Sequence, residues 1–325
     1  MDRLPEHRRA VQTVFERALS PPATRLAVTG ATGWLGKALV EMAARAGLSP
    51  KNGRLRAFAS KPGRLVLEGG TTLDLEALAD AAPLTGEGWT VAHFAALGKE
   101  RTVDLSTADY VAQSEALHRA ALRLISRADR PRLIFASSGA VYGPNGTPPS
   151  LADEPYGHTK GLHEVALADW CGTNLAPLTI CRVFNVGGPY GNKLDLYALS
   201  SLIRSALAGG DIPIRAQGPV LRSYVHVEEL MALLVGQAQS AAPGPSRPFD
   251  SAGVEVVEIG DLARMVCAQL ELDPARIVRR QDPEAPVSRY VGDGADYQAA
   301  ARGLGLTPIG IEAIVSDSIA SLCGR

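Results

Sequence analysis

Tyr156 and Lys160, preceded in the chain by Ser138, are the residues whose types and spacing most clearly could do chemistry. Because Tyr156 and Lys160 are four positions apart, a helix would place the phenol and the ammonium on one face. A free tyrosine ionises near pH ~10, but a neighbouring cation favours the phenolate and lowers that pKa. With a serine hydroxyl beside it to hold an oxygen, the phenol could move a proton on a hydroxyl group while a nicotinamide moves the hydride.

The spacing of Tyr156 and Lys160 is common on exposed helices, so the pair alone is weak evidence of a catalytic site. A glycine-rich turn earlier in the chain strengthens this interpretation. Gly30, Gly33 and Gly36 follow a short apolar run, and Trp34 and Leu35 open a helical pattern. Glycines in that context let the backbone approach a pyrophosphate at a helix N-terminus. The sequence therefore predicts a dinucleotide site, with a tight structural turn as the alternative.

The end of the second expected strand, 54–59, carries the residues that would choose between NAD and NADP. An acid at this place would bind the ribose hydroxyls, but the chain has Ser60 and Lys61, with Arg64 nearby. Because these cations can neutralise a 2′-phosphate, we favour NADP(H) over NAD(H). Ordinary solvated cations are the alternative, since the loop at 49–53 leaves the register open.

Composition limits the class of protein. The 325 residues, 46% of them apolar, suit one large α/β domain or two unequal ones with a sizeable core. The net charge of −1 argues against a nucleic-acid partner. We also expect no membrane span, no secretory signal and a cytoplasmic location, because long apolar runs are missing. The four cysteines show no metal spacing with histidine, so reduced thiols and no metal are expected.

Short apolar strands alternate with helical patterns, which predicts a doubly wound parallel sheet. The expected strands are 26–28, 54–59, 90–95, 132–136, 178–183 and 249–251, and the expected helices are 6–19, 35–46, 108–127, 158–170, 196–208 and 258–271.

This pattern divides the chain into three parts. Residues 1–22 form an N-terminal arm that packs on the domain or on a partner subunit. Residues 23–184 form a Rossmann dinucleotide-binding domain, with return segments near 221–255. Residues 185–220 and 256–325 form a smaller, mainly C-terminal α/β substrate domain.

In this order, the motifs resemble the extended short-chain dehydrogenase/reductase family, in the NAD(P)-dependent sugar-nucleotide epimerase/dehydratase/reductase branch. The likeness covers about residues 24–320. Its markers are the turn at 29–36, Asp74-Leu75, His93-Phe94-Ala95-Ala96, the serine motif at 137–143, Tyr156 with Lys160, Arg182-Val183-Phe184-Asn185 with Gly188-Pro189, and the run at 222–227.

The resemblance implies a role for each matching residue. Ser138, Tyr156 and Lys160 would be catalytic, and Ser138, Asn185 and Arg222 would bind the substrate. Arg222 suits a diphosphate because its guanidinium is planar and always charged, although an ion pair with Glu228 or Glu229 is the alternative. The implied cofactor contacts are Gly30, Gly33, Trp34, Leu35, Gly36, Ser60, Lys61, Asp74, Leu75, Phe94, Ala95, Ala96, Tyr156, Lys160 and Phe184.

Four features depart from the family pattern. Gly139 and Ala140 follow Ser138 where dehydratases of this branch place acids, so 4,6-dehydration is not expected. Gln113 stands where a helix asparagine is usual, but it offers the same donor and acceptor types. The loop between Tyr142 and Tyr156 is short, and the N-terminal arm is additional.

The sequence leaves three functions open. A sugar-nucleotide epimerase, acting through a transient keto-sugar with Tyr156 as acid/base, is slightly favoured because the serine motif lies at the chemistry. An NADPH-dependent keto-sugar-nucleotide reductase is favoured by Ser60 and Lys61. A non-catalytic NADP-binding regulator on the same fold is the alternative from another class. The resemblance also implies a homodimer, formed through the helices at 108–127 and 158–170.

Overall fold

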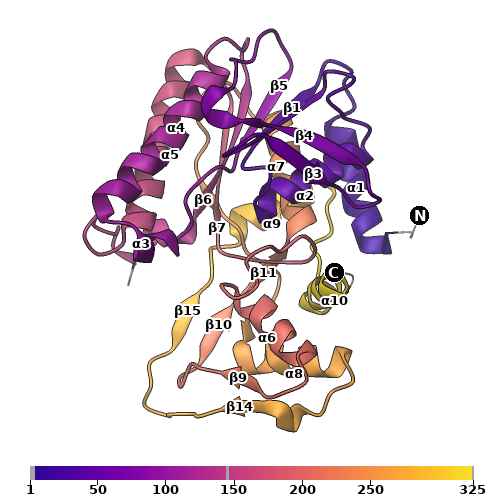
Figure 1. The fold of residues 1–325 in the computed structure, drawn as a ribbon, viewed down its shortest axis with the longest axis vertical. Coiled ribbons are helices and arrows are strands. Elements are labelled where there is room, and N and C mark those ends of the chain that lie inside the picture. The colour runs from indigo at the N-terminus through magenta and orange to yellow at the C-terminus, as the bar shows by residue number, and fades with distance from the viewer. Residues whose placement is uncertain (1–3, 144–145, 324–325) are drawn as a thin grey trace.

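A parallel sheet forms the centre of the computed structural model, which describes residues 4–143 and 146–323. The sheet has eight strands in the order β12-β7-β6-β5-β1-β2-β4-β3 (Figure 1). Only the edge strand β3 runs antiparallel to its neighbour. This arrangement confirms the expected Rossmann-like fold class. The strands are β1 (Arg25–Thr29), β2 (Leu55–Ala59), β3 (Gly63–Val66), β4 (Thr72–Ala77), β5 (Trp89–His93), β6 (Arg132–Ser138), β7 (Leu178–Val183) and β12 (Phe249–Asp250).

Helices cover both faces of this sheet, so its central strands are buried and read as apolar runs. The helices α4 (Thr107–Ile125) and α5 (Pro155–Asn174) pack on one face, around Leu124 and Leu167. The other face carries α2 (Trp34–Arg45) and α7 (Val227–Ser240). Figure 1 shows these two helical layers on opposite sides of the strands.

The N-terminal arm is a helix, α1 (Glu6–Ala18), that packs on the chain itself. Val11 and Phe15 are buried against α7 and α2. The Arg8 guanidinium makes two contacts with the Glu228 carboxylate, at 2.7 and 2.8 Å. The sequence analysis expected this arm to pack on its own domain or on a partner subunit, and the structure shows it packed on its own domain.

A smaller α/β region follows β7 and lies below the sheet in Figure 1. Its three-stranded sheet has the order β13-β10-β15, and two further parallel pairs, β8 with β11 and β9 with β14, complete it. Its elements are β8 (Asn185–Gly187), α6 (Ala198–Leu207), β9 (Ile212–Ile214), β10 (Val220–Arg222), β11 (Tyr224–His226), β13 (Val257–Glu258), α8 (Ile259–Gln269), β14 (Ile277–Arg279), β15 (Ser288–Tyr290) and α10 (Ile311–Cys323). The helix α9 (Ala295–Leu304) returns to the central sheet, where it packs on α7 and β12.

The sequence analysis did not predict some of these elements. The helix α7 is buried on nearly all sides, so its apolar residues show no one-sided period. The edge pair β3 and β4 was also missed, and it contains Asp74-Leu75. The expected helix 158–170 is longer than predicted, because Pro155 occupies a first-turn position where proline is favoured.

Candidate active site

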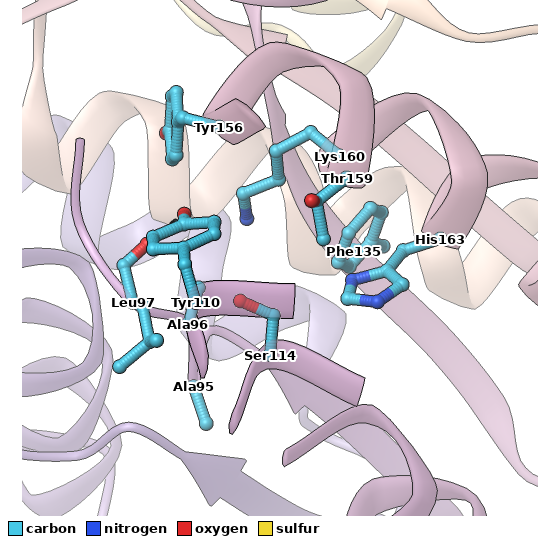
Figure 2. Close-up of a pocket in the computed structure, with 10 residues that line it drawn as sticks. All are labelled: Ala95, Ala96, Leu97, Tyr110, Ser114, Phe135, Tyr156, Thr159, Lys160 and His163. Atoms are coloured by element: carbon cyan, nitrogen blue, oxygen red, sulfur yellow. Dashed lines mark hydrogen bonds between the residues drawn. The ribbon is translucent and has the colours of Figure 1, made fainter. Parts of the chain in front are cut away.

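The structure brings Ser138, Tyr156 and Lys160 together at the carboxyl end of β6. Ser138 is the last residue of that strand, while Tyr156 and Lys160 lie one turn apart near the start of α5. The Ser138 hydroxyl lies beside the Tyr156 phenol and accepts from the Ala140 backbone N–H at 3.2 Å. Tyr156 and Lys160 line one narrow pocket, which Figure 2 shows with Ala95, Ala96 and Tyr110. The predicted triad is therefore assembled.

Lys160 is fixed by its surroundings. Its ammonium donates to the Ala136 carbonyl at 2.7 Å and lies over the Phe135 ring, 4.8 Å from the centroid. Burial lowers the Lys160 pKa to about 8, and the charge of Glu164 acts in the opposite direction. Lys160 thus presents a mostly protonated amine at neutral pH.

The phenol of Tyr156 is harder to ionise than the sequence analysis expected. Burial raises the Tyr156 pKa, and the nearby Ser138 hydroxyl only partly offsets this effect. The expected lowering of the Tyr156 pKa by Lys160 is not found, because burial raises this pKa and the neighbouring tyrosines act in the same direction. A further positive charge is needed to favour the phenolate at neutral pH.

The glycine turn has the close packing that a dinucleotide cradle requires. Gly30 has φ +71°, and a Cβ there would come within 2.8 Å of the Phe94 backbone. A Cβ on Gly36 would lie 2.1 Å from the Gly30 carbonyl oxygen. Gly33 is the N-cap of α2, so free backbone N–H groups face the turn. The residues present therefore fit a pyrophosphate at this helix N-terminus.

Ala95, Trp34 and Leu35, which were predicted to contact a cofactor, lie next to the glycine turn. The Ala95 N–H donates to the Thr29 hydroxyl at 3.2 Å, which holds the segment after β5 beside the turn. Trp34 at the start of α2 donates its indole N–H to the Pro189 carbonyl at 2.6 Å, and Leu35 beside it is partly buried.

The residues expected at the adenosine ribose lie at the end of β2. Ser60 and Lys61 are exposed directly after β2, and Arg64 is exposed within β3. Arg64 forms an ion pair with Asp74, with 3.3 Å between Nε and Oδ1. Asp74 and Leu75 lie inside β4. The strand continues to Ala77, which pairs with Ala59 at the end of β2. Asp74 therefore points to solvent on an edge pair, below the level of the strand ends.

The substrate side of the site is built from β8, β10 and β15. Asn185 donates through Nδ2 to the carbonyls of Ser223 and Tyr290, at 3.1 and 3.0 Å. Arg222 donates to the Ser288 carbonyl at 3.0 Å and to its hydroxyl at 3.2 Å. Asn185 thus holds two segments of the smaller region in place, and Arg222 is oriented without a carboxylate partner in the described part of the chain.

The alternative ion pair of Arg222 with Glu228 or Glu229 is wrong. Glu228 binds Arg8 and Arg45 instead. Glu229 accepts from the Tyr297 phenol and the Ile309 N–H. Burial lowers the Arg222 pKa, so an anion that approaches the guanidinium would relieve an unpaired, half-buried charge.

Tyr290 is a site residue that the sequence analysis missed. Its phenol lies 3.4 Å from the Ser138 hydroxyl, and its ring lies 4.6 Å from that of Phe184. Phe184 in turn fills the space beside Gly139, where a Cβ would come within 2.6 Å of its ring. No spacing in the sequence signals Tyr290, because the pairing of β10 with β15 places it.

Two of the histidines have structural partners. The Nδ1 of His93 lies 2.9 Å from the Thr29 hydroxyl. His7, His226 and Asp317 lie close enough to hold a metal. However, the His226 Nδ1 accepts from the Glu228 N–H, so its Nε2 carries the hydrogen and faces Asp317. This tautomer offers no lone pair to a metal and instead joins α1, α7 and α10.

No helix in residues 4–143 and 146–323 has the length and apolar content to cross a membrane. The fold and the site define an extended short-chain dehydrogenase/reductase. The chain belongs to the NAD dependent epimerase/dehydratase family, whose model matches residues 26–249.

Three known proteins illustrate this similarity. A UDP-glucose 4-epimerase of Corynebacterium glutamicum is 26% identical over 212 residues, which are 57% of this chain and 61% of that protein. A dTDP-L-rhamnose 4-epimerase of Burkholderia thailandensis is 31% identical over 129 residues, 37% of this chain and 35% of that protein. The match thus spans less than two thirds of either relative. The solved structure of TunA, an NAD-dependent NDP-hexosamine 5,6-dehydratase involved in tunicamycin biosynthesis, shares the fold, with a TM-score of 0.70 and 21% identity over 93% of this chain and 98% of that chain.

Proposed function

We propose that this protein is a sugar-nucleotide epimerase that oxidises its substrate transiently to a keto-sugar. The observation that carries the proposal is the assembly of Ser138, Tyr156 and Lys160 beside a glycine turn that fits a dinucleotide. The two relatives named as 4-epimerases support the same reaction.

In the proposed mechanism, Tyr156 takes the proton from a sugar hydroxyl and returns it after the keto-sugar has rotated. A bound nicotinamide would supply hydride transfer and, when oxidised, a positive charge that favours the Tyr156 phenolate. Ser138 would hold the reacting oxygen by a hydrogen bond. Lys160 adds a positive charge in the same pocket as the phenol and would hold the nicotinamide ribose.

The substrate side suits a nucleoside diphosphate sugar. The Arg222 guanidinium has no carboxylate partner in the described residues, and its planar shape suits two diphosphate oxygens. Asn185 and Phe184 would meet the sugar and the nicotinamide, since they follow β7 next to Ser138 and Tyr290.

The residues after Ser138 argue against 4,6-dehydration. Gly139 has no space for a side chain, because the Phe184 ring occupies it. Ala140 cannot transfer a proton. Although the structurally similar TunA is a dehydratase, elimination of water here would need an acid and a base from other positions.

A keto-sugar-nucleotide reductase is the second candidate. Ser60 and Lys61 are exposed at the end of β2, where they can meet a 2′-phosphate, and they favour an exchangeable NADP(H). The name of the TunA structure, by contrast, specifies NAD. A non-catalytic NADP-binding regulator is a weaker candidate, because it would not require the triad.

We further propose a homodimer through α4 and α5. Leu162 and Val165 on α5 are 50% and 60% exposed, an unusual exposure for apolar residues that a partner helix would cover. The buried free thiols of Cys171, Cys181 and Cys267 accord with a reducing, cytoplasmic location.

The deciding experiment identifies the dinucleotide released from freshly purified protein by mass spectrometry and titrates the stripped protein with NAD+ and NADPH. The protein is then incubated with UDP-glucose and with dTDP-sugars, and the products are separated by chromatography. Retained NAD(H) and an epimer formed without net change in nicotinamide absorbance support the epimerase. Net consumption of NADPH favours the reductase, and dinucleotide binding without turnover favours the regulator.

A further inference from the structure

A charged cleft of about 340 Å³ lies at the edge of the central sheet opposite to the proposed active site. It is formed where β5, β6 and β7 begin, by the loops that precede these strands and by the segment that follows α7. The lining residues are Glu87, Gly88, Asp129, Arg130, Arg132, Leu175, Pro177, Ala241 and Pro243. Sites for small organic molecules have volumes of about 300 to 1,000 Å³, so the cleft is large enough for such a ligand.

The cleft is separate from the proposed active site. Arg132 is the first residue of β6 and Ser138 is the last. Over the seven residues of this strand, a rise of about 3.3 Å per residue places the two ends about 20 Å apart. The smaller region lies at the carboxyl ends of the strands, as Figure 1 shows, and the cleft lies at their amino ends. Binding in the cleft can therefore be measured separately from turnover.

The cleft also lies beyond the helical face through which we propose that the homodimer forms. Leu162 and Val165, the exposed apolar residues of that face, belong to the body of α5. Leu175 follows the last turn of this helix. The other lining residues belong to the strand ends and to the segment after α7, which packs on the opposite face of the sheet. A ligand therefore reaches the cleft without crossing the proposed dimer interface.

Arg132 has a guanidinium group that the protein itself leaves without a partner. Its Nε atom is buried and has no hydrogen-bond partner within residues 4–143 and 146–323. Arg132 also forms no ion pair with a carboxylate of these residues. A buried N–H without an acceptor is unfavourable, and an oxygen of a ligand would relieve this cost. A carboxylate suits the position, because its two oxygens match two N–H groups of the planar guanidinium.

Two residues of the cleft have a backbone conformation that their side chains disfavour. Arg130 has φ +44° and Leu175 has φ +51°, in the left-handed region where glycine is usual. Four non-glycine residues in the described part of the chain have a positive φ, and two of them line this cleft. Leu175 is also 65% exposed, so its side chain gains little from the core. Strain of this kind is concentrated at functional sites, which supports a use for these side chains.

The charges around Arg132 limit the chemistry of the ligand. Glu87 and Asp129 bring two carboxylates to the cleft. Arg130 lies 3.9 Å from Asp129, which is too far for a hydrogen bond. Because the two carboxylates would repel a polyanion such as a nucleic acid, a ligand with a single carboxylate is favoured. Amino or hydroxyl groups on the same molecule would donate hydrogen bonds to the acids.

An apolar wall completes the cleft. Leu175, Pro177, Ala241 and Pro243 lie beside the charged groups. Hydrocarbon surface next to a few polar groups that fix orientation is typical of sites for small organic molecules. An inorganic anion would leave this surface in water, so the wall favours a ligand with a carbon skeleton.

We propose that this cleft is a second binding site, for a small carboxylic acid that also carries an amino or a hydroxyl group. Its carboxylate binds the Arg132 guanidinium, and its carbon skeleton lies on Leu175. Its amino or hydroxyl group donates to Glu87 or Asp129. This inference goes beyond the proposed function, because it concerns the opposite edge of the sheet. Amino acids and sugar acids both have this chemistry, and the experiment distinguishes them.

The test is isothermal titration calorimetry of the full-length protein with L-leucine, L-phenylalanine, D-glucuronate and D-galacturonate. We expect one of these two classes to bind with a Kd of about 1 mM or tighter. Acetate, which has the carboxylate alone, should bind about tenfold more weakly, because it makes no hydrogen bond to the acids. Binding of the amino acids identifies an amino acid site, and binding of the uronates identifies a sugar acid site. Binding of none of the four, or equal binding of acetate, would overturn the proposal.

Substitutions of Arg132 show whether the probe binds in the cleft. Arg132→Gln removes the charge and should weaken binding about tenfold or more. Arg132→Lys keeps the charge but loses the planar fork, so its affinity should lie between those of Arg132→Gln and the wild type. Arg302→Gln, which removes an exposed arginine of α9 outside the cleft, is the control and should bind as the wild type does.

Leu175→Gly tests the cleft without a risk to the fold. Glycine adopts the left-handed angle without strain, so the melting temperature should stay at or above that of the wild type. Affinity for the probe should fall about threefold, because part of the apolar wall is lost. Unchanged affinity in both Arg132→Gln and Leu175→Gly would overturn the proposal. Turnover of sugar nucleotides by the same preparations tests the proposed function separately, since neither substitution touches Ser138, Tyr156 or Lys160.

Discussion

The Tyr290 phenol lies 3.4 Å from the Ser138 hydroxyl, although 152 positions separate the two residues in the chain. Tyr290 belongs to the smaller region and Ser138 to the end of a central strand, so this contact ties the two parts together at the site of the proposed chemistry. Its ring packs on Phe184, which fixes its direction. The hydroxyl of Tyr290 is therefore placed to share the substrate oxygen that Ser138 would hold in the proposed mechanism.

Tyr290→Phe should lower kcat/KM by about three- to tenfold, the effect of one hydrogen bond to the substrate or to Ser138. The ring and its packing on Phe184 stay, so the melting temperature should hardly change. Steady-state kinetics with the identified sugar nucleotide measures the effect. Tyr190→Phe is the control, since it removes a phenol that bonds to Glu228 and Arg8 away from the proposed site. Equal kinetics for wild type and Tyr290→Phe would show that the phenol does not touch the reacting oxygen.

Tyr156→Phe should lower turnover by about 10²- to 10⁴-fold, because it removes the proposed acid/base while keeping the ring. Dinucleotide affinity should stay close to that of the wild type, since the glycine turn is unaffected. Calorimetric titration with NAD+ and a turnover assay separate the two effects. Turnover at the wild-type rate would contradict the proposed role of Tyr156.

Lys61→Ala should weaken NADPH binding about tenfold and leave NADH binding unchanged, because only NADPH carries the 2′-phosphate that a cation there would meet. Lys61 is preferred to Arg64 for this test, because Arg64 is already paired with Asp74. Lys51→Ala, in the exposed loop before β2, is the control. An equal loss of affinity for NADPH and NADH, or no loss of affinity for either, would remove the reason to favour NADP(H).

Arg8→Ala should destabilise the protein by about 3 kcal/mol, because it leaves the Glu228 carboxylate buried with Arg45 as its remaining cation. Burial acts to raise the Glu228 pKa, but the hydrogen bond and charge of Arg8 outweigh it, and the pKa falls to about 2. Urea unfolding measures the loss. Arg9→Ala, on the exposed side of the same helix, should change stability by less than about 0.5 kcal/mol. A loss no larger than that of the control would mean that α1 contributes little.

The sequence predicted the central sheet well because its strands are short apolar runs between helices of clear period. It failed for α7, whose burial on nearly all sides hides the helical period. Local spacing was enough to predict where Tyr156, Lys160 and the glycine turn lie in their helices, and their roles stay predictions. Tyr290 and the cleft around Arg132 were missed, because the first depends on pairing between β10 and β15 and the second on the beginnings of three strands that meet only in the fold. The direction of the Tyr156 pKa shift was predicted wrongly, because burial raises this pKa and local spacing does not report burial.

Glu229 should make the stability of the protein fall as pH rises. Burial raises its pKa to about 7 from the usual 4.5, although the Ile309 N–H and the Tyr297 phenol favour its charged form. A carboxyl with a raised native pKa contributes stability that is fully present below pH 4.5 and is lost as pH rises through about 7. Glu229→Gln, which keeps an acceptor for Ile309, should remove this dependence and be more stable than wild type above that pH, by up to about 3 kcal/mol. Urea unfolding across this pH range, with the exposed Glu312→Gln as control, tests the prediction, and parallel pH profiles for wild type and Glu229→Gln would refute it.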